Sequence, residues 1–164
     1  MTFLTSILLS LTVLSADQPV ETPGRKIAIT VQIKSQKPIT FTVEELGKLE
    51  HTKVEINAGE DQQTYEGVCV AAILQAAGVK WGTTPSPWLD CYVLVEAADG
   101  YRAVFSIPEI DLGSAHMAVL LADRRNGKAL SKTEGPYQII EEDARHRGRW
   151  VRQVIAIHVR TASE

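Results

Sequence analysis

Apolar and polar residues alternate in short runs along most of this chain, a pattern that predicts strands more often than helices. Residues 27–33 (IAITVQI) alternate and are largely β-branched, so we expect a strand there. The pattern predicts further strands over residues 53–57, 91–97, 101–107, 117–122, 137–140 and 151–159. Asp99-Gly100 and Asn126-Gly127 lie beside these strands and are typical two-residue hairpin turns.

Two segments carry helix signals instead. Thr42 and Glu45 match a capping box, in which a hydroxyl and a carboxylate bond orphan amides, so we expect a short helix over residues 43–49. Residues 68–77 (VCVAAILQAA) are apolar nearly all round and stop at Gly78, which predicts a buried helix with a left-handed cap. Residues 58–64 and 80–89 are predicted loops. Strands and short helices without a βαβ rhythm predict an α+β fold with a mixed or antiparallel sheet.

Length and composition fit one globular domain. The chain has 164 residues, of which 45% are hydrophobic and 23% charged. Its formal charge of -3 shows no basic excess, so we do not expect a nucleic-acid partner. Two cysteines, Cys69 and Cys91, are too few for a disulfide scaffold. They are either two buried thiols or one disulfide, and sequence spacing leaves both open.

The first sixteen residues predict an export signal. Their apolar run, residues 3–14, is too short to span a bilayer and fits a secretory signal peptide over 1–16. The alternative is a buried N-terminal helix or strand. It stays open because the terminal amine is the only positive charge at the start of the sequence, where a signal peptide has a positively charged region. Residues 17–25 read as a flexible lead-in to a single domain, 26–164. The first arginine is Arg25, so no twin-Arg motif is present, and we expect Sec-type export to the periplasm or exterior with no membrane span in the mature chain.

A charged stretch near the C-terminus holds the strongest candidate chemistry. Residues 145–152 (RHRGRWVR) place four arginines around Trp150, behind three acids. A tryptophan beside guanidinium groups offers a flat stacking surface and planar donors, which suit heteroaromatic rings, carboxylates or phosphates. In a strand Trp150 and Arg152 would share one face, and Arg149 and Val151 the other. The alternative is a solvated turn with Trp150 anchored in the core. The four histidines show no metal-ligand spacing.

Several short segments, taken together, resemble one family. In order they are 65–68 (YEGV), 74–79 (LQAAGV), 98–105 (ADGYRAVF), 120–123 (LLAD), 126–128 (NGK), 135–140 (GPYQII) and 149–154 (RWVRQV). Their order and spacing resemble the small, exported branch of the sulfite-oxidase, or molybdopterin-binding oxidoreductase, family over roughly residues 27–160. The resemblance implies a sulfite-oxidase-type α+β fold for the domain.

The resemblance also implies a cofactor, and here this chain departs from the family. Full members bind molybdenum through a pterin dithiolene and one cysteine, which matches Asn57 of the segment Asn57-Ala58-Gly59. An amide is a poor substitute for the thiolate that such sites select. A chain exported without a twin-Arg signal would also arrive without a preloaded cofactor. We therefore expect no metal, and a reduced pterin rather than molybdopterin.

Six residues are candidates for contacts with a pterin. Trp150 is the expected aromatic contact, with Arg149 and Arg152 as donors, and Asp99, Tyr101 and Glu109 as further polar contacts. The last three each have a structural alternative: an Asp-Gly turn, a core position, and a capping box with Ser106. The family usually has a proline where 141–143 (EED) stands, which leaves the ligand's identity open.

The resemblance and these residues leave three functions open. The first, which the resemblance implies, is a non-catalytic, periplasmic pterin-binding module that acts on a periplasmic or membrane signalling protein. The second is a molybdopterin-dependent oxidoreductase with an unexpected ligand. The third is a structural or interaction domain in which the pocket is vestigial.

Overall fold

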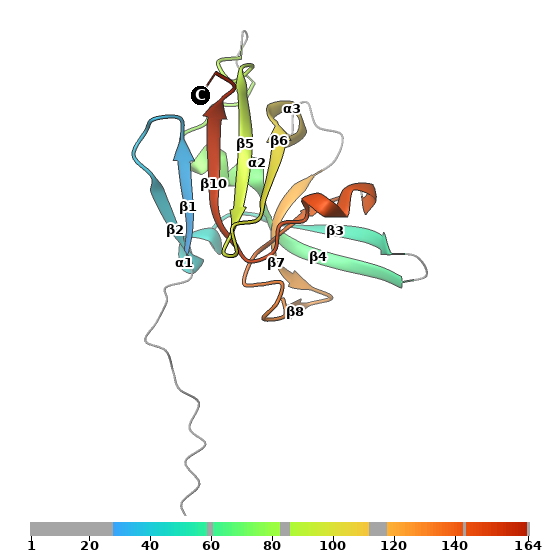
Figure 1. The fold of residues 1–164 in the computed structure, drawn as a ribbon. Coiled ribbons are helices and arrows are strands. Elements are labelled where there is room, and N and C mark those ends of the chain that lie inside the picture. The colour runs from blue at the N-terminus through green and yellow to red at the C-terminus, as the bar shows by residue number, and fades with distance from the viewer. Residues whose placement is uncertain (1–27, 59–60, 83–85, 112–117, 143, 164) are drawn as a thin grey trace, which may run out of the picture.

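The structure is a computed structural model that describes residues 28–58, 61–82, 86–111, 118–142 and 144–163. The predicted signal peptide and lead-in lie outside these ranges. The elements are β1 (Ala28–Ile33), β2 (Ile39–Thr42), α1 (Val43–Leu46), β3 (His51–Ala58), β4 (Asp61–Cys69), α2 (Val70–Ala76), β5 (Cys91–Ala97), β6 (Arg102–Ser106), α3 (Ile107–Ile110), β7 (Val119–Arg125), β8 (Lys128–Ala129), β9 (Gln138–Glu141), the 3-10 helix η1 (Ala144–Arg149) and β10 (Val154–Thr161). They form two sheets with few, short helices, as expected for an α+β fold (Figure 1).

Sheet A contains the strands β2-β1-β10-β5-β6 in that order. β1 and β10 run parallel, and the other three pairs are antiparallel, so the predicted mixed sheet is confirmed. β5 and β6 form the predicted hairpin, where the amide of Tyr101 donates to Asp99 Oδ1 at 2.9 Å and Gly100 has a φ of 86°. The last strand of the domain therefore lies between the first strand and this hairpin.

Sheet B contains β3-β4-β7-β8, and β9 also pairs with β7. Asn126 and Gly127 both have positive φ and close the predicted β7–β8 turn. The β4–β7 register shifts between Glu66 and Gly67, which marks a bulge. In Figure 1 the β3–β4 hairpin projects sideways from the upright strands of sheet A, and η1 lies above it.

Two apolar clusters hold these layers together. The larger one joins the inner face of sheet A to α2 and includes Phe105 and Ile73, both 0% exposed. The smaller one fills sheet B around Ile56, Tyr65 and Ile140, and Trp150 packs against it. Within the described ranges, no helix is both long and apolar enough to cross a bilayer.

Local chemistry correctly predicted both capping boxes. Thr42 Oγ1 accepts from the amide of Glu45 at 3.2 Å, and Glu45 Oε2 accepts from the amide of Thr42 at 2.8 Å. Ser106 and Glu109 repeat the arrangement at α3. Gly78 follows α2 with a φ of 106°, as expected for a left-handed cap.

The predicted loop at 58–64 is wrong. β3 continues to Ala58 and β4 begins at Asp61, so this polar stretch belongs to a hairpin. Gln62 is exposed on β4, and its Nε2 donates to Glu55 Oε2 on the paired strand at 2.7 Å. A polar strand of this kind lacks the apolar alternation from which strands are predicted.

Several element boundaries also differ from the prediction. Val68 and Cys69 pair with β7 and end β4, so the helix predicted over 68–77 is shorter. The helix predicted over 43–49 ends at Leu46, and the strand predicted from residue 151 begins at Val154. Gln153 has a φ of 49°, which interrupts extended backbone immediately before β10. Tertiary pairing, rather than local propensity, fixes these ends.

Candidate functional site

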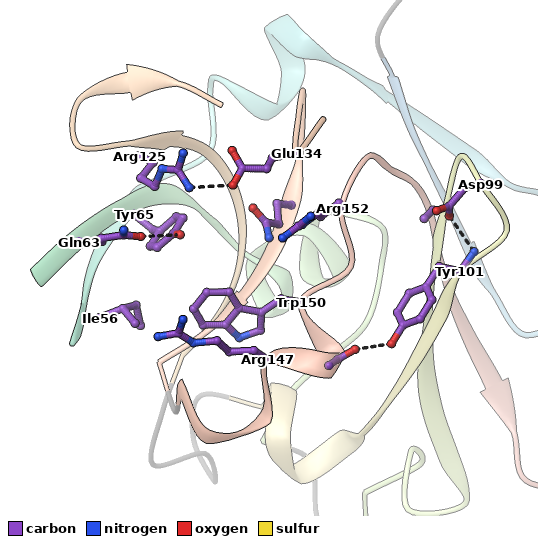
Figure 2. Close-up of a pocket in the computed structure, with 13 residues that line it drawn as sticks. Ile56, Gln63, Tyr65, Asp99, Tyr101, Arg125, Glu134, Arg147, Trp150 and Arg152 are labelled. Atoms are coloured by element: carbon purple, nitrogen blue, oxygen red, sulfur yellow. Dashed lines mark hydrogen bonds and ion pairs between the residues drawn. The ribbon is translucent and has the colours of Figure 1, made fainter. Parts of the chain in front are cut away.

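A cleft of about 520 Å³ lies where the two sheets meet η1 (Figure 2). β3, β4, β7 and β9 contribute residues from sheet B, while β5 and its turn contribute from sheet A. Its lining residues are Ile56, Gln63, Tyr65, Ala97, Asp99, Tyr101, Arg125, Glu134, Gln138, Arg147, Gly148, Trp150 and Arg152. The volume falls within the range of small-molecule sites.

Trp150 stands in the middle of this cleft (Figure 2). Its ring meets Tyr65 edge-to-face, with centroids 5.8 Å apart and planes at 74°. The guanidinium of Arg147 lies over the same ring, 5.3 Å from its centroid. Trp150 packs against the smaller core cluster and also lines the cleft. It is therefore both anchored in the core and available as an aromatic contact for a ligand. The indole is thereby fixed between an aromatic neighbour and a cation.

One end of the cleft carries an ion pair. Arg125 Nη1 contacts Glu134 Oε1 at 2.7 Å, and Glu134 Oε2 accepts from the Ser131 hydroxyl at 2.7 Å. Burial raises the pKa of Glu134, but Ser131, Arg125 and Arg152 together lower it below its usual value. Glu134 is therefore ionised at neutral pH and holds Arg125 in place.

The other end is formed by the β5–β6 turn. Asp99 and Tyr101 both line the cleft, and the Tyr101 hydroxyl donates to the carbonyl of Gly148 (Figure 2). Asp99 thus serves the turn and the cleft together. Tyr101 is 51% exposed, so the alternative of a core position is wrong. Three guanidinium groups and two carboxylates line the whole cleft, which gives it a positive balance in a chain of net charge -3.

Arg149 and Glu109 lie outside the lining. Arg149 Nη2 contacts Glu109 Oε1 at 2.8 Å, and the same guanidinium binds Glu141 and lies over the Phe105 ring, 4.6 Å from its centroid. Glu141 and Glu109 raise the pKa of Arg149, which stays charged. The structure therefore brings four of the six candidates together (Trp150, Arg152, Asp99 and Tyr101) and places these two in a separate network.

This network predicts acid sensitivity. Burial raises the pKa of Glu109, but the Ser106 amide and Arg149 lower it more, so its pKa lies below the ordinary 4.5. A carboxyl whose pKa is lower in the folded than in the unfolded protein stabilises the fold at pH values above its unfolded-state pKa. This stabilisation is lost as the pH falls through its folded-state pKa. The unfolding free energy of the wild-type protein should therefore fall between pH 7 and pH 3. We expect this fall to be about 0.5 kcal/mol smaller in Glu109→Gln, a small difference because the Glu109–Arg149 pair is partly exposed. Urea denaturation at both pH values measures this, with the exposed Glu44→Gln on α1 as control. An unchanged pH dependence in Glu109→Gln would contradict it.

Comparison with known proteins shows that the fold of this chain is similar to part of a solved structure. No protein-family model and no curated protein matches the sequence. Among solved structures, the chain aligns with the sulfane dehydrogenase SoxCD from Paracoccus pantotrophus, with a TM-score of 0.63 and 19% identity. The fold resembles part of that dehydrogenase. The alignment covers 81% of this chain but 38% of the SoxCD chain, so this chain spans well under half of it.

The lining does not fit a thiolate-bound molybdenum. None of the described residues that line the cleft is a cysteine. Asn57, at the position matched to the family's cysteine, lies exposed on β3 and outside the lining. Cys69 and Cys91 are both buried and free, which answers the disulfide question, and neither lines the cleft. Among described residues, no group of three or more His, Cys, Asp or Glu side chains is arranged to hold a metal ion.

The sequence did not single out several lining residues. Gln63, Tyr65, Arg125 and Gln138 reach the cleft through the pairing of β3, β4, β7 and β9, and Glu134 reaches it from the segment between β8 and β9. Arg147 belongs to the charged stretch 145–152 that the sequence did identify, but it was not among the six candidate contacts; η1 brings it to the cleft. Tyr65 and Arg125 are direct register partners, although they lie sixty positions apart in the sequence. Tyr65 and Gln138 belong to segments that carried the family resemblance, and this was the available signal.

Proposed function

We propose that this protein is a pterin-binding module of the sulfite-oxidase type, exported to the periplasm, that acts in signalling rather than catalysis. The observation that carries the proposal is the Trp150 ring, held by Tyr65 and Arg147 within a cleft of about 520 Å³. A preorganised aromatic face with nearby planar donors is what a flat heteroaromatic ligand needs.

The polar residues suit the edges of a pterin. Arg147 and Arg152 provide donors for ring or side-chain oxygens, while the Asp99 carboxylate provides an acceptor for an amino group. Because none of the described residues that line the cleft is a cysteine, a reduced pterin is a better candidate ligand than a metal-bearing molybdopterin. Sulfite-oxidase-type membership rests on the sequence resemblance and on the distant likeness to SoxCD.

The proposed localisation rests on the signal peptide that the sequence predicts, and the proposed partner on the family resemblance. A signal peptide would direct the mature domain to the periplasm or outside the cell. A pterin-loaded domain there acts on a periplasmic or membrane signalling protein. Tyr101, half-exposed at the cleft and bonded to Gly148, is a point at which such a partner can meet the ligand site.

A molybdopterin-dependent oxidoreductase is the second candidate. The likeness to a chain named sulfane dehydrogenase favours it. It requires a metal ligand other than a cleft cysteine. Elemental analysis separates the two, because stoichiometric molybdenum in protein isolated from its own periplasm would replace the first proposal with the second.

We expect a reduced pterin to bind one-to-one and to stabilise the purified domain. At a ligand concentration one hundred times Kd, binding adds about 2.7 kcal/mol to the unfolding free energy. For a chain of this length, that corresponds to a rise in Tm of roughly 5–10 °C. Thermal denaturation with tetrahydropterin, together with native mass spectrometry of periplasmic protein, measures both. No rise in Tm and no bound small molecule would favour a structural domain with a vestigial pocket.

A further inference from the structure

Two buried polar atoms in the cleft lining have no hydrogen-bond partner: Gln138 Oε1 and Trp150 Nε1. Five side chains in the described part of the chain have such a buried atom, and among the five Gln138 alone is itself a buried residue. Leaving a buried donor or acceptor unpaired costs free energy. Such groups are rare in native proteins, so an unpaired atom on a buried side chain that lines a cleft points to a ligand.

Gln138 is the more constrained of the two. It is 2% exposed and opens β9, opposite Ala122 of β7. Its two chain neighbours are bonded to the segment that follows Trp150: the amide of Ile139 donates to the carbonyl of Val151 at 2.8 Å, and the carbonyl of Tyr137 accepts from the amide of Val154 at 3.0 Å. The backbone therefore fixes the Gln138 amide beside the Trp150 segment. Packing alone gives no reason for an amide here, since an apolar side chain of the same volume would leave nothing unpaired.

The chemistry of an amide defines what it can recognise. A glutamine amide presents a donor beside an acceptor in either of its two orientations. Its complement is a lactam edge, in which a ring N–H lies next to a C=O. A ring whose N–H is replaced by N–CH3 has no donor for the Gln138 oxygen and brings a methyl group against the amide. Such a ring keeps the same flat face for stacking, so it isolates the contribution of this edge.

We propose that Gln138 is the specificity-determining residue of this site and that it pairs with the lactam edge of the bound pterin, which is the ring N–H and the adjacent C=O. This rests on the proposed function, to which it adds the edge of the ligand that is recognised. Trp150 supplies the stacking face, and its Nε1 supplies a further donor when the ligand settles against the indole. The unpaired amide is thus a recognition group that is satisfied on binding.

Isothermal titration with two air-stable ligands, 2-amino-4-oxopteridine and its 3-methyl derivative, tests the proposal. We expect the wild-type protein to bind the unmethylated ring at least tenfold more tightly, because only that ring offers an N–H to Gln138 Oε1. Gln138→Met should abolish the preference while leaving Tm equal or higher, since it removes an unpaired buried group. Gln75→Met, on the exposed side of α2, is the matched control and should change neither ratio nor Tm.

The outcomes separate this inference from the function on which it rests. If the wild-type protein binds neither ring, both proposals fall. If it binds them and the affinity ratio is the same in wild type and Gln138→Met, pterin binding stands and the role of Gln138 is refuted.

Discussion

Replacing Trp150 by alanine is expected to weaken pterin binding by about 2–3 kcal/mol, which corresponds to roughly 30- to 150-fold in Kd. The indole lies in the middle of the cleft, and Tyr65 and Arg147 hold its orientation before any ligand arrives. Truncation removes the stacking face and also releases Arg147 from its position over the ring. Titration of tetrahydropterin into the wild-type and variant proteins measures the loss.

The control must separate binding from stability, because Trp150 also packs against the smaller core cluster. Trp88→Ala is suited to this: Trp88 is partly buried, donates from Nε1 to the Lys80 carbonyl at 3.1 Å and lies outside the cleft. We expect it to lower Tm without changing Kd. Wild-type affinity in Trp150→Ala would remove Trp150 from the site, and an equal loss in Trp88→Ala would attribute the effect to folding.

Much of the fold followed from local chemistry. The capping residues Thr42 and Ser106 and the turns at Asp99-Gly100 and Asn126-Gly127 each satisfy backbone groups within a few residues, so they can be recognised without tertiary information. The β3–β4 hairpin could not be recognised in this way. Its strands are polar where they face solvent, and their partners are set by sheet pairing rather than by an apolar period.

The sequence predicted the part of the candidate site around Trp150 and missed the part that sheet B contributes. The alternation around Trp150 was informative, because Trp150 and Arg152 line the cleft while Arg149 and Val151 do not. Arg149 was nevertheless expected to be a donor to the ligand, and this expectation overlooked η1. In a 3-10 turn residues three apart share a face, and the amide of Trp150 donates to the Arg147 carbonyl at 3.1 Å. Arg147 therefore accompanies Trp150, and Arg149 turns towards Glu109 and Glu141.

The sheet-B half of the cleft depends on a close approach between the backbones of β4 and β7. Gly67 lies at the bulge where β4 meets β7, next to the paired residues Tyr65 and Arg125. A Cβ atom at position 67 would stand 2.2 Å from the Leu121 carbonyl oxygen and 2.5 Å from the Cα of Ala122. Both obstacles are backbone, so no side-chain rotation relieves the clash. Glycine is required here by the distance between the strands.

Gly67→Ala is therefore expected to destabilise the fold by at least about 3 kcal/mol, because β4 and β7 must separate to admit one methyl group. For a chain of this length, Tm should fall by roughly 6–12 °C. The matched control is Gly148→Ala, since a Cβ there meets nothing within 4 Å; its unfolding free energy should stay within about 0.5 kcal/mol of wild type. Urea denaturation compares the two, and a Gly67→Ala protein as stable as Gly148→Ala would contradict the close approach. Because separation of the strands also displaces Tyr65 from the Trp150 ring, the folded fraction of Gly67→Ala should bind pterin more weakly, although position 67 itself does not line the cleft.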